Sequence, residues 1–414
     1  MTLCYDEPLE IVGGEGRRAI DAQGRRYLDF FAGSRTNCLG YNIPELADAI
    51  RRQLAKAELL TATSYLIRSE IELAERIACL SDIPDAKVCF VQSGTEANEL
   101  ALMLACQHRH SNQVLALRNS FHGRGFATAS ATGIRGWSTT SLSPLHVTHV
   151  HGAYRYRGPF RHLDDADYIR ACTEDLRDLL ANSAIGDVAC LIAEPVQGVG
   201  GYAPVPRGLF TSYREVLDEH GILLISDEPH SGWGRGGEHF WGITAHDVTP
   251  DAITFMKGLG HGLSIGAVIA RPELMDALGS AVATTGCNPL ATAAANAALD
   301  YLETHDLQAN AGKQGTRLLT GLQTLAETSP VVGDVRGLGL MIGIELVEPG
   351  SDAPNPKAAT LLQEQARSRG LLIGKGGLHD NVLRLEPPMT LTDLESDEAL
   401  NILAEALNSM NQRS

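Results

Sequence analysis

The stretch AITFMKGLGHGLSIGAVIA, residues 252–270, joins two apolar runs through a lysine and a glycine-rich segment. The run AITFM has the length and the β-branched content of a buried strand. The run LSIGAVIA (263–270) predicts a second strand. Lys257 stands where the first strand ends. It is either an ordinary solvated lysine at the start of a loop or an amine with a chemical role.

Apolar runs of the same kind alternate with helical patterns through the middle of the chain. They are KVCFV (87–91), QVLAL (113–117), DVACLIA (187–193) and ILLIS (222–226). Continuous Val, Ile, Leu and Ala runs separated by helices are typical of a parallel sheet that is covered on both faces. The predicted fold class is therefore α/β, with a mostly parallel central sheet flanked by helices.

The pattern changes after residue 289, where helices mix with shorter strand-like runs. We expect three parts in the chain. Residues 1–50 form an N-terminal segment that packs with the small domain and the active site, residues 51–300 form the large cofactor-binding domain, and residues 301–414 form a smaller α+β domain.

Composition excludes several classes of partner. The net charge of −16 over 414 residues disfavours nucleic acid, because phosphate binding needs clustered Lys and Arg. No run reaches the roughly 18 apolar residues of a membrane span, so no membrane partner is expected. The N-terminus has no signal-peptide pattern, so a cytoplasmic location is expected. None of the eight cysteines forms a C-x-x-C pair, which favours reduced thiols over a metal site or disulfides.

Residues with reactive or binding groups follow the predicted strands, at the edge where ligands bind in open α/β sheets. They are Ser93-Gly94-Thr95, Phe121-His122, Glu194, Asp227 with His230, and Lys257. Each has a structural alternative. Ser93 or Thr95 could cap a helix, and Phe121 could belong to the core. Asp227 could cap a turn or bind a metal.

One cofactor, pyridoxal 5′-phosphate (PLP), uses all of these groups at once. Gly94 and Thr95 stand where a predicted helix begins, and free N–H groups and the helix dipole there suit a phosphate. Phe121 can stack on the ring, and Asp227 can hold a protonated ring nitrogen by a charge-assisted bond. Lys257 can form a Schiff base with the aldehyde if its pKa is lowered.

Seven ordered motifs carry a resemblance to a known family. They are SGTEAN (93–98), SFHGR (120–124), AEPVQGVGG (193–201), SDEPHSGWGR (226–235), KGLGHGLSIGAV (257–268), TTGCNPLA (284–291) and LRLEPPM (383–389). Over nearly the whole chain the sequence resembles the class III (ornithine, acetylornithine and 4-aminobutyrate type) PLP-dependent aminotransferases. IGKGGLHDNVLRLEPP is most similar to the alanine–glyoxylate aminotransferase 2-like branch. The resemblance implies the fold-type I architecture of PLP enzymes and no metal.

The resemblance also assigns roles to residues. Lys257 and Asp227 would be the catalytic pair. The other cofactor contacts would be Ser93, Gly94, Thr95, Phe121, His122, Glu194, Pro229, His230 and Thr284. Thr284 would reach the phosphate bound by the partner subunit, which implies a homodimer with shared active sites.

Two further assignments concern substrate and a competing lysine. Arg384 matches the family arginine that binds a substrate carboxylate, and the alternative is a surface arginine on an edge strand. Lys375 in IGKGG is the competing lysine and is expected to be structural, since no phosphate motif or helix start follows it.

Three departures from the family pattern bear on substrate. Pro229-His230 replace the usual aliphatic residue and the glutamine that bonds the ring hydroxyl. His230 either replaces the glutamine as a hydrogen-bond donor to the ring hydroxyl or adds a titratable group to the site. Val199 replaces a glutamate that gates the carboxylate-binding arginine in many relatives, which argues against a strict ornithine or 4-aminobutyrate enzyme. Arg35 falls in a segment that lines the substrate pocket in relatives. It would suit a second acidic group, or it is an exterior or structural arginine.

The expected function is an aminotransferase that moves an amino group from an amino acid or primary amine to a keto acid, aldehyde or ketone, in a specialised biosynthetic role. Racemisation or epimerisation, amino-mutase, decarboxylase and phospho-lyase chemistry are the enzymatic alternatives. A non-catalytic binding module that keeps the fold is the remote one.

Overall fold

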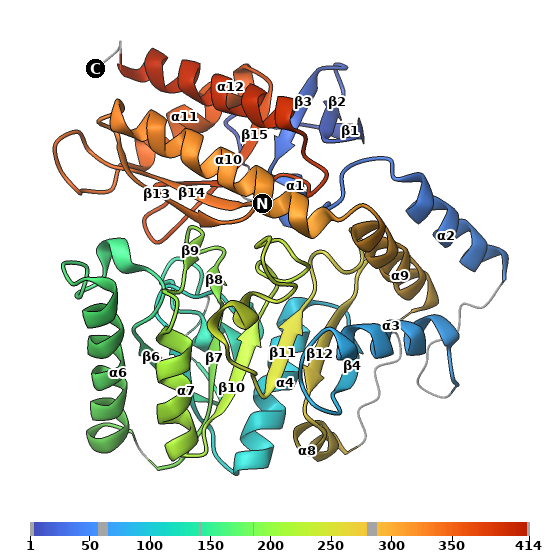
Figure 1. Cartoon of the computed structure of the whole chain (residues 1–414), viewed down its shortest axis with the longest axis vertical. Coiled ribbons are helices and arrows are strands. Elements are labelled where there is room, and N and C mark those ends of the chain that lie inside the picture. Colours follow the sequence, from blue (N-terminus) through green and yellow to red (C-terminus); the bar gives the residue numbers. More distant parts are fainter. Residues whose placement is uncertain are drawn as a thin grey trace.

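Two seven-stranded sheets form the frame of the protein, one below the other in Figure 1. The structure is a computed structural model that describes residues 4–56, 65–138, 140, 142–184, 186–279 and 288–411. A short two-stranded sheet, β8 (Val196–Gln197) and β9 (Ala203–Pro204), lies close to the junction between the two large sheets.

The lower sheet has the strand order β4-β12-β11-β10-β7-β5-β6. Its strands are β4 (Lys87–Val91), β5 (Gln113–Leu117), β6 (His146–Val150), β7 (Val188–Ala193), β10 (Leu223–Asp227), β11 (Ala252–Phe255) and β12 (Gly266–Ala270). All pairings are parallel except those of β12, which runs antiparallel to both β11 and β4. The predicted α/β class with a mostly parallel sheet is confirmed.

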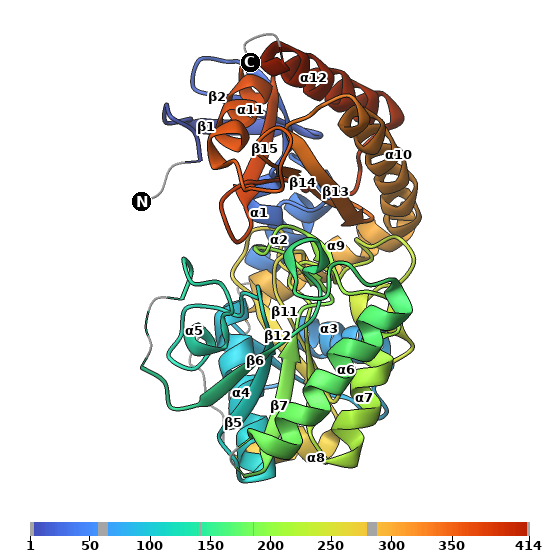
Figure 2. The same cartoon turned by 90° about the vertical axis from the view of Figure 1, so that its left-hand side faces the viewer.

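The apolar runs of the sequence are continuous because helices cover both faces of this sheet. Every residue of β7 and β10 is buried. Figure 2 shows α4 (Gly94–Arg109) on one side of the sheet, and α6 (Asp165–Asn182) and α7 (Leu209–Glu219) on the other. Strands that are buried on both faces cannot alternate polar and apolar residues, so only the strand ends are free to carry polar groups.

The upper sheet combines the two ends of the chain in the order β1-β2-β3-β15-β16-β14-β13. Its strands are β1 (Ile11–Glu15), β2 (Arg18–Asp21), β3 (Arg26–Phe30), β13 (Val332–Leu338), β14 (Met341–Leu346), β15 (Leu371–Gly376) and β16 (Val382–Leu385). The joint is the parallel pairing of β3 with β15. The expected domain boundaries remain a prediction, but the first strands do enter the C-terminal sheet.

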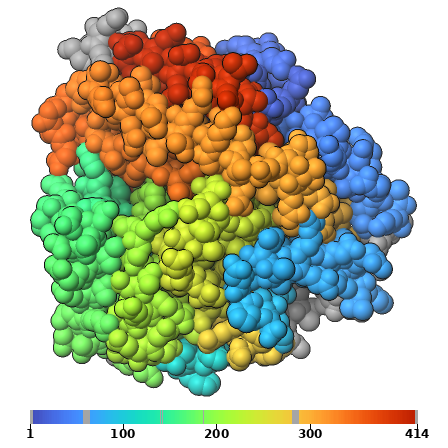
Figure 3. Space-filling view, viewed as in Figure 1, coloured from blue at the N-terminus to red at the C-terminus, as the bar shows by residue number. Residues whose placement is uncertain are grey.

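The remaining helical segments complete the two layers. They are α1 (Ala32–Arg35), α2 (Pro44–Ala55), α3 (Arg68–Cys79), α5 (Thr128–Ala131), η1 (Arg155–Arg157), η2 (Gly242–His246), α8 (Pro272–Met275), η3 (Asp276–Leu278), α9 (Pro289–Thr304), α10 (Leu307–Glu327), α11 (Pro356–Ser368) and α12 (Asp393–Asn411). The space-filling view in Figure 3 shows α10 and α12 (orange and red) above the green and yellow surface of the large sheet's helices and loops. Among the described residues, no helix has the length and apolar character to cross a membrane.

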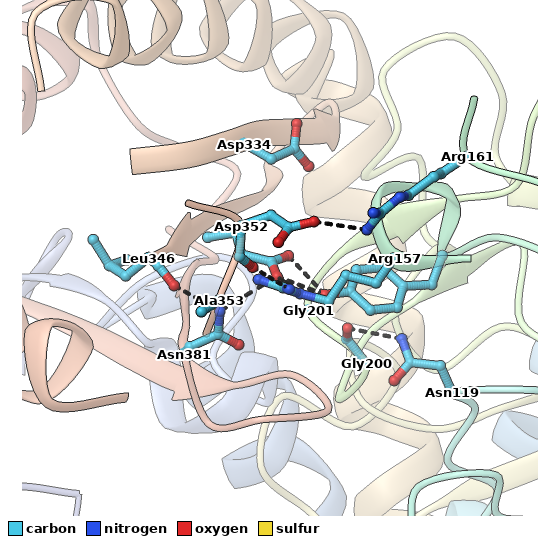
Figure 4. Close-up of polar contacts among 12 residues, drawn as sticks. Asn119, Arg157, Arg161, Gly200, Gly201, Asp334, Leu346, Asp352, Ala353 and Asn381 are labelled. Carbon is cyan, nitrogen blue, oxygen red and sulfur yellow. Dashed lines mark hydrogen bonds and ion pairs between the residues drawn. The ribbon is translucent and has the colours of Figure 1, made fainter. Parts of the chain in front are cut away.

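A polar network joins the two parts of the molecule on one side of this junction (Figure 4). Arg161 donates to the Asp352 carboxylate at 2.8 Å, and Arg157 donates to the Asp352 carbonyl. Arg157 also pairs at 2.5 Å with the fully buried carboxylate of Glu345 on β14. Because the arginines follow β6, Glu345 lies on β14 and Asp352 follows β14, these bonds tie the two parts of the molecule together.

Two segments differ in detail from the sequence expectation. The strand expected at 263–270 begins only at Gly266, because Leu263 donates its N–H to the Gly260 carbonyl in a turn. The run GLGLMIGIEL (337–346) spans the end of β13 and all of β14, which pair as an antiparallel hairpin. A glycine at 339 with φ +54 makes the tight turn possible.

Candidate active site

The predicted site residues meet at one edge of the lower sheet. β4, β5, β7, β10 and β11 all run in the same direction, so their carboxyl ends share that edge. Asp227 is the last residue of β10, and Lys257 follows the end of β11 by two positions. This is the edge at which open α/β sheets bind ligands.

Lys257 and His230 are in direct contact. The Lys257 amine lies 2.5 Å from Nε2 of His230. Gly198 presses against the imidazole, since a Cβ at position 198 would lie 2.2 Å from its Cδ2 atom. The Tyr202 ring packs edge-on against it, with centroids 5.8 Å apart. The imidazole is therefore held in one orientation, which only glycine at 198 permits.

The Lys257 amine has an unusually low proton affinity. Part of the Lys257 side chain reaches solvent. The burial of its amine is nevertheless the largest of the causes that lower the pKa of Lys257 to about 7. The positive charges of Arg35 and Arg384 lower it further, while Glu386 and Glu194 oppose them. Burial and the charge of Lys257 also hold the pKa of His230 well below its ordinary value. At neutral pH a neutral imidazole thus faces an amine that is close to half deprotonated.

The Asp227 carboxylate is buried and held by three donors. Asn98 donates to it at 2.9 Å, Thr254 donates at 3.1 Å, and Nδ1 of His122 lies 2.8 Å away. Asn98 also accepts a bond from Thr254 and donates to the His122 carbonyl. His122 thus contacts Asp227 and fixes its orientation, and its predicted contact with the cofactor stays a prediction.

Glu194 fixes two loops at the same edge. It accepts the N–H of Phe121 at 2.8 Å and that of Gly198 at 2.9 Å. Burial raises its pKa to about 7. Phe121 packs edge-on against Trp137 at 5.5 Å between centroids, which holds the aromatic ring in place. Glu194 therefore positions both the Phe121 ring and Gly198, the glycine that contacts His230.

The start of α4 supplies free backbone N–H groups. Ser93 caps this helix by accepting the Glu96 N–H at 3.2 Å, so its hydroxyl has the structural role that the sequence left open. Gly94 and Thr95 occupy the first turn, where the N–H groups have no acceptor within the helix. A Cβ at Gly123 would lie 2.7 Å from the Thr95 hydroxyl, so glycine keeps that hydroxyl accessible.

The two predicted substrate arginines are both interior. Arg384 lies on β16, which runs between β15 and β14, so the edge-strand alternative is wrong. Arg35 is 1% exposed and donates to the Pro229 carbonyl at 2.8 Å, so the exterior alternative is wrong as well. Lys375, by contrast, bonds to Thr360 at 2.9 Å on α11, away from this edge.

Sequence reasoning missed several residues of this site. Asn98 lies one helical turn after Gly94, a spacing that could have placed it beside the strand ends. Thr254 lies on β11, three residues before Lys257. Tyr202 and Glu386 are joined by a short hydrogen bond. Tyr202 directly follows the motif at 193–201 and Glu386 lies within the motif at 383–389, but neither residue carried a signal of its own. Thr284 lies outside the described residues.

These residues fit PLP. The structure supplies an amine of lowered pKa, a buried carboxylate with neutral donors, a held aromatic ring and the first turn of a 16-residue helix. Buried nitrogens without a partner, His230 Nδ1 and Nε of both Arg35 and Arg384, leave donors for a polar ligand. No cluster of potential metal ligands occurs in the part of the chain that the structure describes.

Comparisons with known proteins agree with this fit. Residues 5–407 match the family model "Aminotransferase class-III". The chain is 37% identical to alanine–glyoxylate aminotransferase 2 homolog 2 of Arabidopsis thaliana, covering 99% of this chain and 85% of the relative. It is 33% identical to the Homo sapiens alanine–glyoxylate aminotransferase 2, covering 100% and 84%. An alanine/serine racemase of Pyrococcus horikoshii is 32% identical over 97% of this chain and 86% of its own.

Solved structures give the same result. A PMP-bound aminotransferase of Vibrio fluvialis has a TM-score of 0.91 and 27% identity, covering 98% of this chain and 93% of that one. An Arthrobacter phospholyase in complex with phosphoethanolamine has a TM-score of 0.89 and 34% identity, covering 99% and 96%.

One expectation is corrected by the relatives. The expected cytoplasmic location is wrong on this comparison, because the Arabidopsis and human proteins are both named as mitochondrial. The resemblance to the family is confirmed over almost the whole chain. The chain therefore belongs to the class III aminotransferases, the PLP-dependent enzymes that transfer an amino group from an amine donor to a carbonyl acceptor.

Proposed function

We propose that Lys257 is the catalytic amine of this aminotransferase and that Asp227 is the acid at the cofactor's ring nitrogen. The observation that carries this proposal is the depressed pKa of Lys257 beside the neutral imidazole of His230, at the edge where Asp227 ends β10. When bound, PLP supplies an aldehyde for the amine and a ring that accepts electrons from the substrate's α-carbon. A lysine that is near neutral at physiological pH can both bond to a carbonyl and move a proton.

The other residues of the site bind the cofactor, bind the substrate or orient Asp227. Gly94 and Thr95 bind the phosphate through the first turn of α4, and Phe121 and Pro229 contact the ring faces. His122 and Asn98 keep the Asp227 carboxylate oriented for a bond to a positive ring nitrogen. Arg384 binds a substrate carboxylate through its free Nε–H.

A half-reaction tests this function. We expect the holoenzyme, mixed with an amino acid donor and no acceptor, to release one equivalent of keto acid per site. The Lys257→Ala variant should release none. Absence of keto acid from every donor tried would contradict the proposal, whereas turnover that needs an acceptor for its second half would support it.

Racemisation is the second candidate, and one observation favours it. Two nitrogen bases, Lys257 and His230, lie side by side, and an additional base could return a proton to the other face of the α-carbon. In D₂O, a racemase would exchange the α-proton and invert the donor without releasing keto acid. The same incubation therefore separates the two reactions.

We propose further that the enzyme is a homodimer with shared active sites. This rests on the family resemblance at Thr284, which would contact the phosphate in the partner subunit. Co-expression of Lys257→Ala with Thr284→Ala tests it, because a hybrid dimer would regain one site with both native residues. Failure to regain activity, with hybrid dimers present, would refute sharing.

A further inference from the structure

The turn that carries Arg35 has an unusual backbone. All four residues of α1 have positive φ: Ala32 (47°), Gly33 (61°), Ser34 (57°) and Arg35 (71°). For residues other than glycine, this left-handed region is sterically unfavourable. Such outliers persist where the surroundings enforce them and gather at functional sites. Asp29 enforces this one by accepting the N–H groups of Phe31 and Ala32, at 3.0 and 2.8 Å.

The turn directs Arg35 into the interior with few partners. One nitrogen donates to the Pro229 carbonyl at 2.8 Å, another approaches Met341 sulfur at 4.0 Å, and Nε has no partner. No carboxylate among the described residues lies within ion-pair distance of this guanidinium. Glu386 and Tyr202 favour the charged form of this guanidinium, but neither forms an ion pair with it, so a ligand anion would stabilise the buried charge further.

Arg384 is also an interior arginine with few partners. It is 7% exposed, its one hydrogen bond with the described residues is a long one of 3.5 Å to the Gly198 carbonyl, and its Nε has no partner there. Its guanidinium lies 5.9 Å from the centre of the Tyr202 ring. Like Arg35, it forms no ion pair in the described part of the chain. The site thus holds two interior guanidinium groups, each with an Nε that has no partner.

The third interior arginine is different. Arg235 donates to the carbonyls of Leu340 and Pro387, so it ties the loop after β10 to the upper sheet. Glu386 favours the charged form of both Arg35 and Arg235, and one of its oxygens accepts a bond from the Tyr202 hydroxyl. Glu386 and Glu194 oppose the guanidinium charges at Lys257, whose pKa is lowered nevertheless.

Arg35 and Arg384 both lie close to the reacting amine. Arg35 bonds to Pro229, whose neighbour His230 contacts the Lys257 amine at 2.5 Å. Arg384 bonds to Gly198, which presses on the same imidazole. The charges of both guanidinium groups also lower the pKa of the Lys257 amine, so both lie near the position of a substrate bonded there.

We propose that Arg35 and Arg384 bind two separate anionic groups of one substrate, so that the enzyme selects amino compounds with two acidic ends. The chemistry shared by these substrates is two oxyanions on one carbon chain: two carboxylates, or a carboxylate and a phosphate. A guanidinium fork suits either anion. This inference rests on the proposed function, since it places the substrate's amine at Lys257.

Ligand binding to the holoenzyme tests the inference without turnover. Calorimetry would compare glutarate, 3-phosphonopropionate and butyrate. We expect at least one of the two dianions to bind 10-fold or more tightly than butyrate, because a charge-assisted pair contributes about 1.5–3 kcal/mol. Tighter binding of glutarate identifies a substrate with two carboxylates, and tighter binding of 3-phosphonopropionate identifies a substrate with a carboxylate and a phosphate. Equal binding of all three would overturn the proposal.

Variants sharpen the same test. Arg35→Met keeps the contact with Met341 but removes the charge, and should weaken the preferred dianion at least 10-fold more than butyrate. The affinity of Arg35→Lys for the preferred dianion should lie between that of the unmodified enzyme and that of Arg35→Met. Arg161→Met, an exposed arginine paired with Asp352, is the matched control and should change none of the three affinities. Equal weakening of dianion and butyrate by Arg35→Met would show a structural arginine and overturn the inference.

The two proposals fail in different ways. If the holoenzyme releases keto acid but binds dianions no better than butyrate, only the inference about Arg35 fails. If no donor gives keto acid, the aminotransferase function fails as well. If Arg35→Met does not fold, the comparison of ligands on the unmodified holoenzyme still decides.

Discussion

The amine of Lys257 lies 2.5 Å from Nε2 of His230, and the imidazole cannot turn away because Gly198 and Tyr202 enclose it. Three arginines and the lysine surround His230, namely Arg35, Arg235, Arg384 and Lys257. A charged imidazole is unfavourable among these cations, so His230 acts as a neutral hydrogen-bond partner throughout the working pH range.

The first prediction concerns His230. The apoenzyme should capture PLP at a rate that rises as pH increases through about 7, because Lys257 then loses its proton. His230→Gln should keep this midpoint, since glutamine offers another neutral partner. His230→Ala should slow capture roughly 10-fold by removing that partner. A midpoint that moves by a full pH unit in His230→Gln would mean that His230 titrates.

The second prediction concerns stability of the apoenzyme. Folding lowers the pKa of Lys257 from 10.5 to about 7, so the folded state binds fewer protons than the unfolded state between these values. Stability should therefore rise as pH increases through this window. Lys257→Met should raise the Tm at pH 7, and its advantage should vanish above pH 10.5. Equal Tm values of Lys257→Met and the unmodified apoenzyme at pH 7 would show that burial of the amine does not destabilise the folded protein.

The third prediction concerns Asn98. Asn98→Ala removes a donor from Asp227, so the carboxylate should be held less firmly and the dissociation constant for PLP should rise roughly 10-fold. Asn310→Ala is the matched control, because its amide also makes two bonds, to Met389 and Leu391 in the upper layer. The control should lower Tm and leave the PLP affinity unchanged. The same affinity loss in both variants would remove the specific role of Asn98.

The fourth prediction concerns the polar network of Figure 4. The buried Glu345 carboxylate bonds to Arg157, Arg336 and Tyr154. Glu345→Ala should lower the free energy of unfolding by about 3–5 kcal/mol, since it takes from Arg157 its buried acid and leaves Arg336 with Asp334 alone. Asp352→Ala removes a solvent-exposed ion pair to Arg161 and should cost about 1 kcal/mol or less. Denaturant unfolding measures both, and similar losses would contradict the buried role of Glu345.

The sequence predicted the lower sheet and its site better than the upper layer. Long apolar runs such as those before Asp227 and Lys257 mark strands that are buried on both faces, and their ends are readable as a site. The sequence could not show that β3 pairs with β15, because that contact joins residues more than 300 positions apart. It could not show the left-handed turn at Arg35 either, since three of its four residues disfavour that backbone.

The contact between Lys257 and His230 also lay beyond the sequence. The resemblance placed His230 at the ring hydroxyl of the cofactor, and the structure adds a direct contact of its Nε2 with the lysine amine. The close approach of Gly198 and the packing of Tyr202 fix that orientation.

The central claim is that Lys257 bonds covalently to the cofactor aldehyde. Borohydride reduction of the holoenzyme, followed by proteolysis and mass mapping of the modified peptide, tests it most directly. We predict one cofactor adduct per chain, at Lys257, and none in Lys257→Ala. An adduct at Lys375, or an unmodified Lys257 in reduced, fully loaded enzyme, would contradict the account.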